Sequence, residues 1–262
     1  MSVCAPAPIP ARLHVAAHSS QTHCLLMHGY NALPAELDDL AGRLAADGLG
    51  RRILRLPGDE GSGRALAEST WDEWTDVVGD AVTDAAHRSD SVIVIGHSLG
   101  AALALWAAVD SSSVSGVVAL CPPLRLWPAE AAAIRVARRV VPSVPAWYVD
   151  ITPKRRHSTP VIEHADPAMP LRPLSGLIAG LRDLRTRLDR VTCPALVVCA
   201  RHDHVVPWRD GLEAYQRLAS QRKELLVLDR SFHAVLHDVE QELVERRVAA
   251  FCQSLRPSRD AP

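Results

Sequence analysis

One tight junction between two apolar segments constrains this chain most. Residues 91–95, SVIVI, form a β-branched run typical of a buried strand, and residues 98–109 form an Ala/Leu-rich run typical of a helix. The two runs meet at residues 96–100, GHSLG, which form a G-x-S-x-G pentapeptide. Such a fast reversal strains the backbone at the serine, and the flanking glycines leave room for the two backbones to approach. The pattern predicts a sharp turn that lifts Ser98 above a sheet, at the start of a helix whose dipole favours negative charge.

The rest of the chain repeats this rhythm of strand and helix. Continuous Val/Ile/Leu runs alternate with helical patterns, which predicts a mostly parallel sheet covered on both faces. The predicted strands are residues 24–27, 52–56, 91–95, 115–120, 195–200 and 224–228. The predicted helices are residues 34–47, 70–87, 98–109, 208–219 and 239–255. The predicted fold class is therefore α/β, a doubly wound sheet, and 262 residues suit one such domain with an insertion.

Residues 121–190 interrupt the rhythm. They carry ten prolines and no apolar run comparable to the predicted strands, which predicts short helices and no regular sheet. Ligands of open α/β sheets bind outside the carboxyl ends of the strands, so an insertion there covers the site. The expected organisation is an N-terminal extension (residues 1–22) with one edge strand near residues 12–17, an α/β core (residues 23–120 and 191–262) and an inserted helical cap (residues 121–190).

The bulk composition argues against several classes of protein. A net charge of −1 gives no overall field that attracts nucleic acid. The first 30 residues lack a basic start followed by a continuous apolar stretch, so no signal peptide is predicted. No apolar run approaches the roughly 18 residues that a membrane-spanning helix needs. The six cysteines are scattered without a CxxC pair, which is typical of free thiols in a reducing cytoplasm. We therefore expect a cytoplasmic protein that binds no nucleic acid.

Ser98 needs a base, because a serine hydroxyl is a poor nucleophile until its proton is removed. His233 follows the apolar run of residues 224–228, so it lies in a loop at the carboxyl end of a strand. Loops at such strand ends carry catalytic side chains. His237 is the alternative, but it lies closer to the start of the last predicted helix. We therefore predict that His233 is the base.

Asp203 is the predicted third member of a catalytic triad. It follows the apolar run of residues 195–200, so it lies on another carboxyl-end loop, where it can orient and charge-stabilise an imidazole. The chain order Ser98, Asp203, His233 is the order expected when the serine lies on a strand-to-helix turn. Asp203 could instead cap the helix near Trp208, but it stands a few residues early for that role.

An oxyanion needs two backbone donors. The N–H of Leu99, directly after the serine, is the first candidate. Residues 25–30, LLMHGY, supply a His-Gly at the end of the first predicted strand, where Gly29 lets the backbone turn close to a substrate. The N–H of Tyr30 is therefore the second candidate. His28 is expected to brace this loop by a hydrogen bond.

In these residues and their order, the chain resembles the α/β-hydrolase superfamily, and within it bacterial carboxylesterases and monoacylglycerol lipases with a small cap. The resemblance implies that Ser98 is the nucleophile, Asp203 the acid and His233 the base. It also implies that the N–H groups of Tyr30 and Leu99 bind the oxyanion. The matching segments are LLMHGYNALPAELDDLA, RRILRLPGDEGSG, WDEWTDVV, VIGHSLGAALALWAA, PALVVCARHDHVVP and SFHAVLHD.

Two regions beside the predicted site match these relatives loosely. Residues 57–63, PGDEGSG, stand where relatives more often carry Pro-Gly-His-Gly, and the cap sequence differs more widely. A helix predicted over residues 129–141 of the cap carries Ile134, Ala137 and Val141 on one face. This apolar face is expected to lie over an acyl pocket. The candidate pocket residues of the cap are Trp127, Ile134 and Trp147.

The cap also concentrates positive charge. Residues 121–160 carry seven Lys and Arg side chains against two acidic ones. On one interpretation, a basic outer face of the cap makes peripheral contact with lipid surfaces. On the other, the arginines only keep a lid helix soluble. The apolar underside is expected in both cases.

Together these features predict a serine hydrolase that cleaves carboxylic esters through an acyl-enzyme, with a medium-chain ester or a monoacylglycerol as substrate. A thioesterase or a cofactor-free perhydrolase on the same triad is the alternative, and the intact triad argues against a non-catalytic ligand receptor. Halide and epoxide chemistry is disfavoured, because those relatives need an aspartate at the position of Ser98. No cofactor is predicted. No metal is predicted either, because no carboxylate or thiolate cluster completes a ligand set around His202 and His204.

Overall fold

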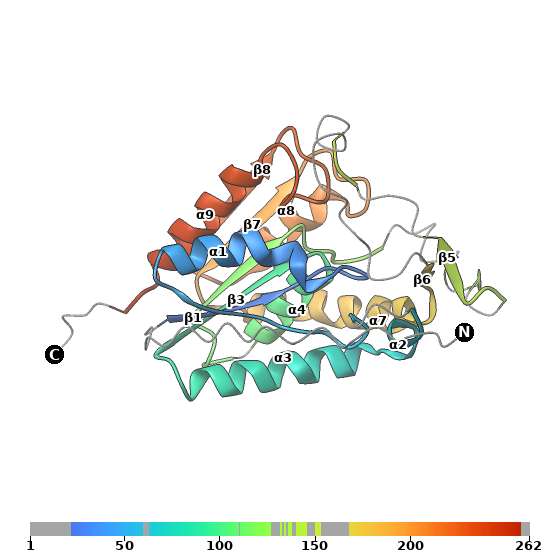
Figure 1. Cartoon of the computed structure of the whole chain (residues 1–262), viewed down its shortest axis with the longest axis horizontal. Helices are drawn as coiled ribbons and strands as arrows, with labels where there is room; N and C mark the ends of the chain where they lie inside the picture. Colours follow the sequence, from blue (N-terminus) through green and yellow to red (C-terminus); the bar gives the residue numbers. More distant parts are fainter. Residues whose placement is uncertain are drawn as a thin grey trace, which may run out of the picture.

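A six-stranded sheet, parallel throughout, forms the centre of the molecule (Figure 1). The computed structural model describes residues 22–59, 63–109, 111–126, 132, 134, 136–137, 140–145, 150–152 and 168–257. The strand order is β2-β1-β3-β4-β7-β8. The strands are β1 (Thr22–Met27), β2 (Gly50–Ile53), β3 (Ser91–His97), β4 (Gly116–Leu120), β7 (Ala195–Ala200) and β8 (Lys223–Leu228). The predicted doubly wound α/β fold is confirmed.

The strand order reverses beside β1. This strand pairs with β2 on one side and with β3 on the other, so Leu25 lies between Arg52 and Val94. The carboxyl ends of β1 and β3 are therefore neighbours at a topological switch point, which is where ligands bind in open α/β sheets. The loop that carries Tyr30 and the turn that carries Ser98 both start there.

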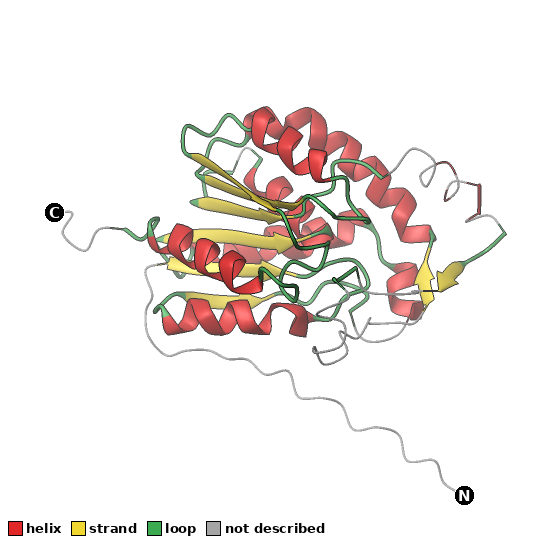
Figure 2. Ribbon diagram, turned by 90° about the horizontal axis from the view of Figure 1, so that it is seen from above, coloured by secondary structure: helices red, strands yellow, loops and turns green. Residues whose placement is uncertain are grey.

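Neighbouring residues of the inner strands pack into opposite apolar layers. Leu25 and Val94 belong to one buried cluster, whereas Leu26 and Ile95 belong to the other. Burial on both faces explains why the inner strands β1, β3, β4 and β7 are apolar runs, whereas the edge strands β2 and β8 are only partly buried. Figure 2 shows the sheet between its helices. The first layer contains α3 (Trp71–Ala86), α4 (Leu99–Ala108), α7 (Arg172–Arg187) and α8 (Trp208–Arg217), and the second contains α1 (Asp38–Ala46) and α9 (Gln241–Gln253).

Local signals explain where the predicted helices begin. α3 starts at a capping box, in which Thr70 Oγ1 accepts the N–H of Glu73 at 3.2 Å and the Glu73 carboxylate accepts the N–H of Thr70 at 2.8 Å. The helix predicted over residues 34–47 is divided into the 3₁₀ helix η1 (Pro34–Leu37) and α1. Two further short helices are α2 (Gly63–Glu68) and η2 (Leu188–Arg190).

The expectation of only short helices and no sheet within residues 121–190 was wrong. This segment contains α7, which is 16 residues long, and two antiparallel strands, β5 (Ser143–Pro145) and β6 (Ala168–Pro170). The prolines end at Pro173, in the first turn of α7, where a missing N–H costs no helical hydrogen bond. α7 packs against α3 so closely that a Cβ at Gly180 would lie 2.3 Å from the ring of Trp71.

The structure bears differently on the predicted N-terminal edge strand and on membrane-spanning helices. The edge strand predicted near residues 12–17 lies outside the described residues. Within the part of the chain that the structure describes, no helix combines the length and the apolar character that crossing a bilayer requires.

Candidate active site

Ser98 lies on the turn between β3 and α4 with a φ of +54° and a ψ of −115°, a conformation that residues with a side chain rarely adopt. Glycine is required on both sides. A Cβ at Gly96 would lie 2.0 Å from the carbonyl oxygen of Gly100, and a Cβ at Gly100 would lie 2.2 Å from the carbonyl oxygen of Met27. The N–H of Ser98 donates to the carbonyl oxygen of Leu120 at 2.9 Å, which fixes the turn on the neighbouring strand β4.

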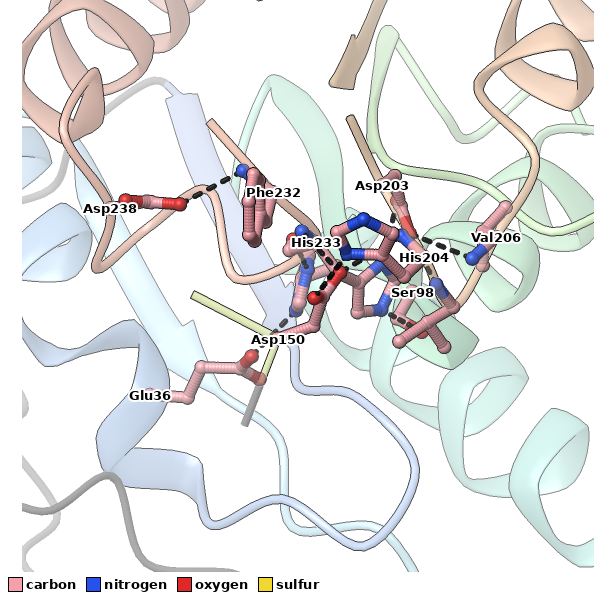
Figure 3. A network of polar contacts seen from close by, with 11 residues as sticks. Glu36, Ser98, Asp150, Asp203, His204, Val206, Phe232, His233 and Asp238 are labelled. Carbon is pink, nitrogen blue, oxygen red and sulfur yellow. Dashed lines mark hydrogen bonds and ion pairs between the residues drawn. The ribbon is translucent and has the colours of Figure 1, made fainter. Parts of the chain in front are cut away.

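Three side chains from three strand ends meet at this turn (Figure 3). His233 Nε2 lies 3.0 Å from Ser98 Oγ, and His233 Nδ1 lies 2.7 Å from Asp203 Oδ2. Asp203 follows β7 and His233 follows β8, so parallel strands deliver both to the same edge of the sheet. The structure therefore brings together the three residues predicted for the triad, and the imidazole that contacts Ser98 belongs to His233.

Asp203 is held in an orientation that suits an imidazole partner. Its Oδ1 accepts the N–H groups of Val205 at 2.8 Å and Val206 at 2.7 Å, which leaves Oδ2 to His233. Burial alone would raise the pKa of Asp203. The charge and hydrogen bond of His233 and the two N–H donors outweigh this, so the pKa of Asp203 lies below its ordinary value. Asp203 is therefore a carboxylate at neutral pH.

The two predicted oxyanion donors lie close to Ser98. Leu99 is the first residue of α4, where a backbone N–H has no partner within the helix. A Cβ at Gly29 would lie 3.5 Å from Ser98 Cβ, so the loop that carries Tyr30 runs beside the serine. Neither the Leu99 nor the Tyr30 N–H donates to an acceptor among the described residues. The Tyr30 side chain is engaged elsewhere, since its hydroxyl donates to the carbonyl oxygen of Pro170 at 2.7 Å.

A buried pair that the sequence did not reveal supports both sides of the site. Glu36 Oε1 lies 2.5 Å from His97 Nδ1, and Glu36 Oε2 accepts the N–H of Gly29 at 2.9 Å. His97 Nε2 lies 2.9 Å from the carbonyl oxygen of His233. His97 carried a signal, because it is part of the pentapeptide. Glu36 carried none, because nothing in its local sequence points to a partner 61 residues away.

Each member of this pair stabilises the charged form of the other. Burial raises the pKa of Glu36, but the charge and hydrogen bond of His97 outweigh it and hold the pKa at about 2. Burial lowers the pKa of His97, but Glu36 outweighs it and raises the pKa above its ordinary value. An imidazolium can donate at both nitrogens, which matches its two acceptors, the Glu36 carboxylate and the carbonyl oxygen of His233.

A second buried pair braces the loop after β1. His28 Nδ1 lies 2.9 Å from the carbonyl oxygen of Gly29, and His28 Nε2 lies 3.4 Å from Asp59 Oδ2. Arg55 donates to the same carboxylate at 2.9 Å. Burial raises the pKa of Asp59, but His28 and Arg55 outweigh it and lower that pKa. Asp59 belongs to the segment PGDEGSG, so this segment places a buried carboxylate beside His28.

One grouping among the described residues has the donor atoms of a metal site. The ligand atoms of His97, Cys121 and His233 lie within 4.8 Å of one another. Both nitrogens of each imidazole already lie within hydrogen-bond distance of an oxygen. Burial also raises the pKa of the Cys121 thiol, which disfavours the thiolate that binds metals. The grouping is explained by hydrogen bonding within the site.

The candidate pocket residues of the cap fall in different parts of the structure. Ile134 is half-buried and, with Ala137, packs against the apolar layer that contains α3 and α4. Val141, expected on the same face, is 41% exposed, because the helical turn ends there before the chain enters β5. Trp127 and Trp147 lie outside the described residues.

Comparison with known proteins identifies the family. A family model described as serine aminopeptidase, S33, matches residues 18–240. The chain belongs to this family. As an S33-family protein it is an α/β-hydrolase of the carboxylesterase and lipase type, which confirms the resemblance found in the sequence.

Three relatives illustrate what this S33-family chain is similar to. The thermostable monoacylglycerol lipase of Bacillus sp. (strain H-257) is 26% identical over 227 residues, which are 87% of this chain and 88% of the lipase. The carboxylesterase of Bacillus subtilis (strain 168) is 25% identical over 235 residues, 88% of this chain and 92% of the esterase. A solved structure from work on LipS and LipT, two metagenome-derived lipolytic enzymes, is 30% identical, with a TM-score of 0.83 over 90% of this chain and 94% of that one.

Proposed function

We propose that this chain hydrolyses carboxylic esters through an acyl-enzyme formed on Ser98. The observation that carries the proposal is the hydrogen-bonded chain from Ser98 Oγ through His233 to Asp203, with contacts of 3.0 and 2.7 Å. The imidazole can accept the hydroxyl proton, and the carboxylate can hold the ring in one tautomer and stabilise its charge.

Each step uses residues already described. Ser98 Oγ bonds to the ester carbonyl carbon while its proton passes to His233 Nε2, and the N–H groups of Leu99 and Tyr30 bind the resulting oxyanion. His233 then gives the proton to the alcohol oxygen, the carbon–oxygen bond breaks, and the alcohol leaves. Water attacks the acyl-enzyme with His233 again as base, which releases the acid and restores Ser98.

The substrate class that we propose is a medium-chain ester or a monoacylglycerol. Two relatives that cover most of this chain bear the names of a monoacylglycerol lipase and a carboxylesterase, rather than of a peptidase. In this proposal residues 121–190 act as a cap over the site, and Ile134, which already packs on an apolar layer, contributes to an acyl pocket.

A fluorophosphonate probe tests the nucleophile. The wild-type chain is expected to be labelled once, and Ser98→Ala to lose both the label and ester hydrolysis. Labelling that persists in Ser98→Ala would overturn the proposal. A panel of p-nitrophenyl esters, monoacylglycerols, acyl thioesters and amino-acid anilides then tests the substrate class. Anilides cleaved faster than every ester would move the activity to peptide bonds.

A further inference from the structure

Asp150 lies outside the triad but contacts both of the loops that carry its acid and its base (Figure 3). The side chain is 3% exposed. Its Oδ2 accepts the N–H of His204 at 3.0 Å and the N–H of His233 at 3.1 Å. His204 directly follows Asp203 in the loop after β7, and His233 lies in the loop after β8. One carboxylate oxygen therefore joins the backbone of the acid loop to the backbone of the base loop.

Other bonds fix Asp150 itself. Its carbonyl oxygen accepts the N–H of Ala234 at 2.9 Å, and its Oδ1 lies 2.8 Å from His204 Nδ1. Two residues later, Thr152 donates its hydroxyl to Asp238 Oδ1 at 2.6 Å and its N–H to Asp238 Oδ2 at 3.1 Å. Residues 150–152 are thus bonded to the loop after β8 both at His233 and beyond it.

We propose that Asp150 is a positioning residue that sets the placement of His233 relative to Asp203, and through it the rate at which Ser98 is activated. The inference rests on the triad proposed above. The side chains of Asp203 and His233 join the two loops directly, and Asp150 also joins them through their backbones. Because Asp150 comes from residues 121–190, docking of this inserted segment and alignment of the triad depend on each other.

The physical reason lies in the two buried N–H groups. Without the carboxylate, the N–H groups of His204 and His233 lose their acceptor, and a buried donor without a partner drives local rearrangement. A displacement of about 1 Å at a reacting group can cost about 10²-fold in rate. The His233 backbone is the part that moves, so the loss is expected in the chemical step and not in substrate binding.

Asp210 offers a matched control. It is also a buried aspartate whose carboxylate accepts two backbone N–H groups, those of Leu124 at 2.9 Å and Arg125 at 3.1 Å. Those partners carry no part of the proposed triad. The Asp210 carboxylate also pairs with the Arg125 side chain at 2.9 Å. Asp210→Ala therefore measures what the loss of a buried, hydrogen-bonded carboxylate does to the fold alone.

The experiment compares the full-length wild type with Asp150→Ala, Asp150→Asn and Asp210→Ala. For each folded protein we measure Tm, kcat and KM on a p-nitrophenyl ester, the rate of fluorophosphonate labelling, and the downfield proton resonance of the His233 Nδ1–H···Asp203 bond. Asp150→Ala is expected to lower kcat and the labelling rate roughly 10- to 100-fold with KM nearly unchanged, and to broaden that resonance. Asp150→Asn should stay within about threefold of wild type, since its amide oxygen can accept both N–H groups.

Asp210→Ala is expected to lower Tm while it keeps the wild-type labelling rate. A wild-type labelling rate in Asp150→Ala, or an equal loss in Asp210→Ala, would overturn the role of Asp150. If Asp150→Ala does not fold, Asp150→Glu replaces it, because the longer side chain keeps the charge but displaces both oxygens, and the same loss is expected. A wild type that is not labelled at Ser98 would instead overturn the proposed triad, and the role of Asp150 with it.

Discussion

Glu36 and His97 stand 61 residues apart in the chain, and 2.5 Å separates Oε1 of the first from Nδ1 of the second. The pair joins the two sides of the site. Glu36 accepts the N–H of Gly29 in the loop that carries Tyr30, and His97 faces the carbonyl oxygen of His233. The backbone beside one proposed oxyanion donor and the backbone of the proposed base are therefore held by a single buried charge pair.

Glu36→Gln is expected to reduce stability in a defined pH window. The pKa of Glu36 falls from 4.5 to about 2, so its stabilisation is present above about pH 4.5 and is lost as the pH falls towards 2. The pKa of His97 is raised above 6.5, so its stabilisation is present below pH 6.5 and is lost as the pH rises through the raised value. The free energy of unfolding of Glu36→Gln should lie furthest below that of the wild type between about pH 4.5 and 6.5, by on the order of 1–3 kcal/mol. The Tm of both proteins, measured at each pH, follows this difference.

The control for this window is Glu68→Gln. Glu68 forms an exposed pair with Arg64, with side chains 64% and 88% exposed. Exposed pairs contribute about 0–1 kcal/mol, so its Tm difference should be small at every pH. A difference for Glu36→Gln that does not change between about pH 3 and pH 9 would contradict the ionised pair.

His233→Ala is expected to lower kcat for ester hydrolysis by roughly 10⁴-fold or more, because Ser98 loses its proton acceptor. His237→Ala is the matched control on the same loop and should cost far less. Steady-state kinetics on a p-nitrophenyl ester measures both. The reverse order of effects would move the base to His237 and bring the role of Asp203 into question.

Asp203→Asn is expected to lower kcat by up to ~10⁴-fold with little change in Tm. The amide oxygen can still accept the N–H groups of Val205 and Val206, so the loop keeps its shape, but the amide holds the imidazole of His233 in the wrong tautomer. Turnover and thermal unfolding are measured on the same preparation. Full turnover in this variant would remove Asp203 from the triad.

Gly100→Ala is expected to prevent folding, because the added Cβ would lie 2.2 Å from the carbonyl oxygen of Met27 in the central sheet. Gly42→Ala is the matched control, since a Cβ added at Gly42 meets nothing within 4 Å and the residue lies inside α1. That control should gain up to about 1 kcal/mol from helix propensity. Circular dichroism and thermal unfolding measure both variants, and a cooperatively folded Gly100→Ala would contradict the packing of the turn.

A roofed acyl pocket should show in the dependence of rate on acyl length. Each buried CH₂ contributes ~0.8 kcal/mol, so kcat/KM for p-nitrophenyl esters should rise about three- to fourfold per methylene until the pocket is full. Ile134→Ser should flatten this rise while acetyl-ester hydrolysis stays nearly unchanged. Val140→Ser is the control from the same segment, because Val140 is 79% exposed. A wild-type rate that falls steadily from the acetyl ester onwards would rule out the roofed pocket.

The sequence by itself determined the sheet, the turn at Ser98 and the candidates for its partners. Continuous apolar runs predict strands buried on both faces, and side chains that directly follow parallel strands lie at the same edge of the sheet. For that reason Ser98, Asp203 and His233 could be named before their distances were known. The glycines at 96 and 100 were readable for the same reason, because only a backbone of minimal bulk fits a strand-to-helix reversal.

Tertiary structure alone decided how these residues are held. Glu36 meets His97 across 61 residues, and Asp150 meets His233 across 83. Both carboxylates come from segments whose local pattern gives no hint of a distant partner. α7 was also missed, because the prolines were counted over the whole of residues 121–190. They end at Pro173, in the first turn of α7, so the residues after it are free to form a helix. Long-range contacts of single polar side chains leave no periodic trace in a sequence, so only the folded chain reveals them.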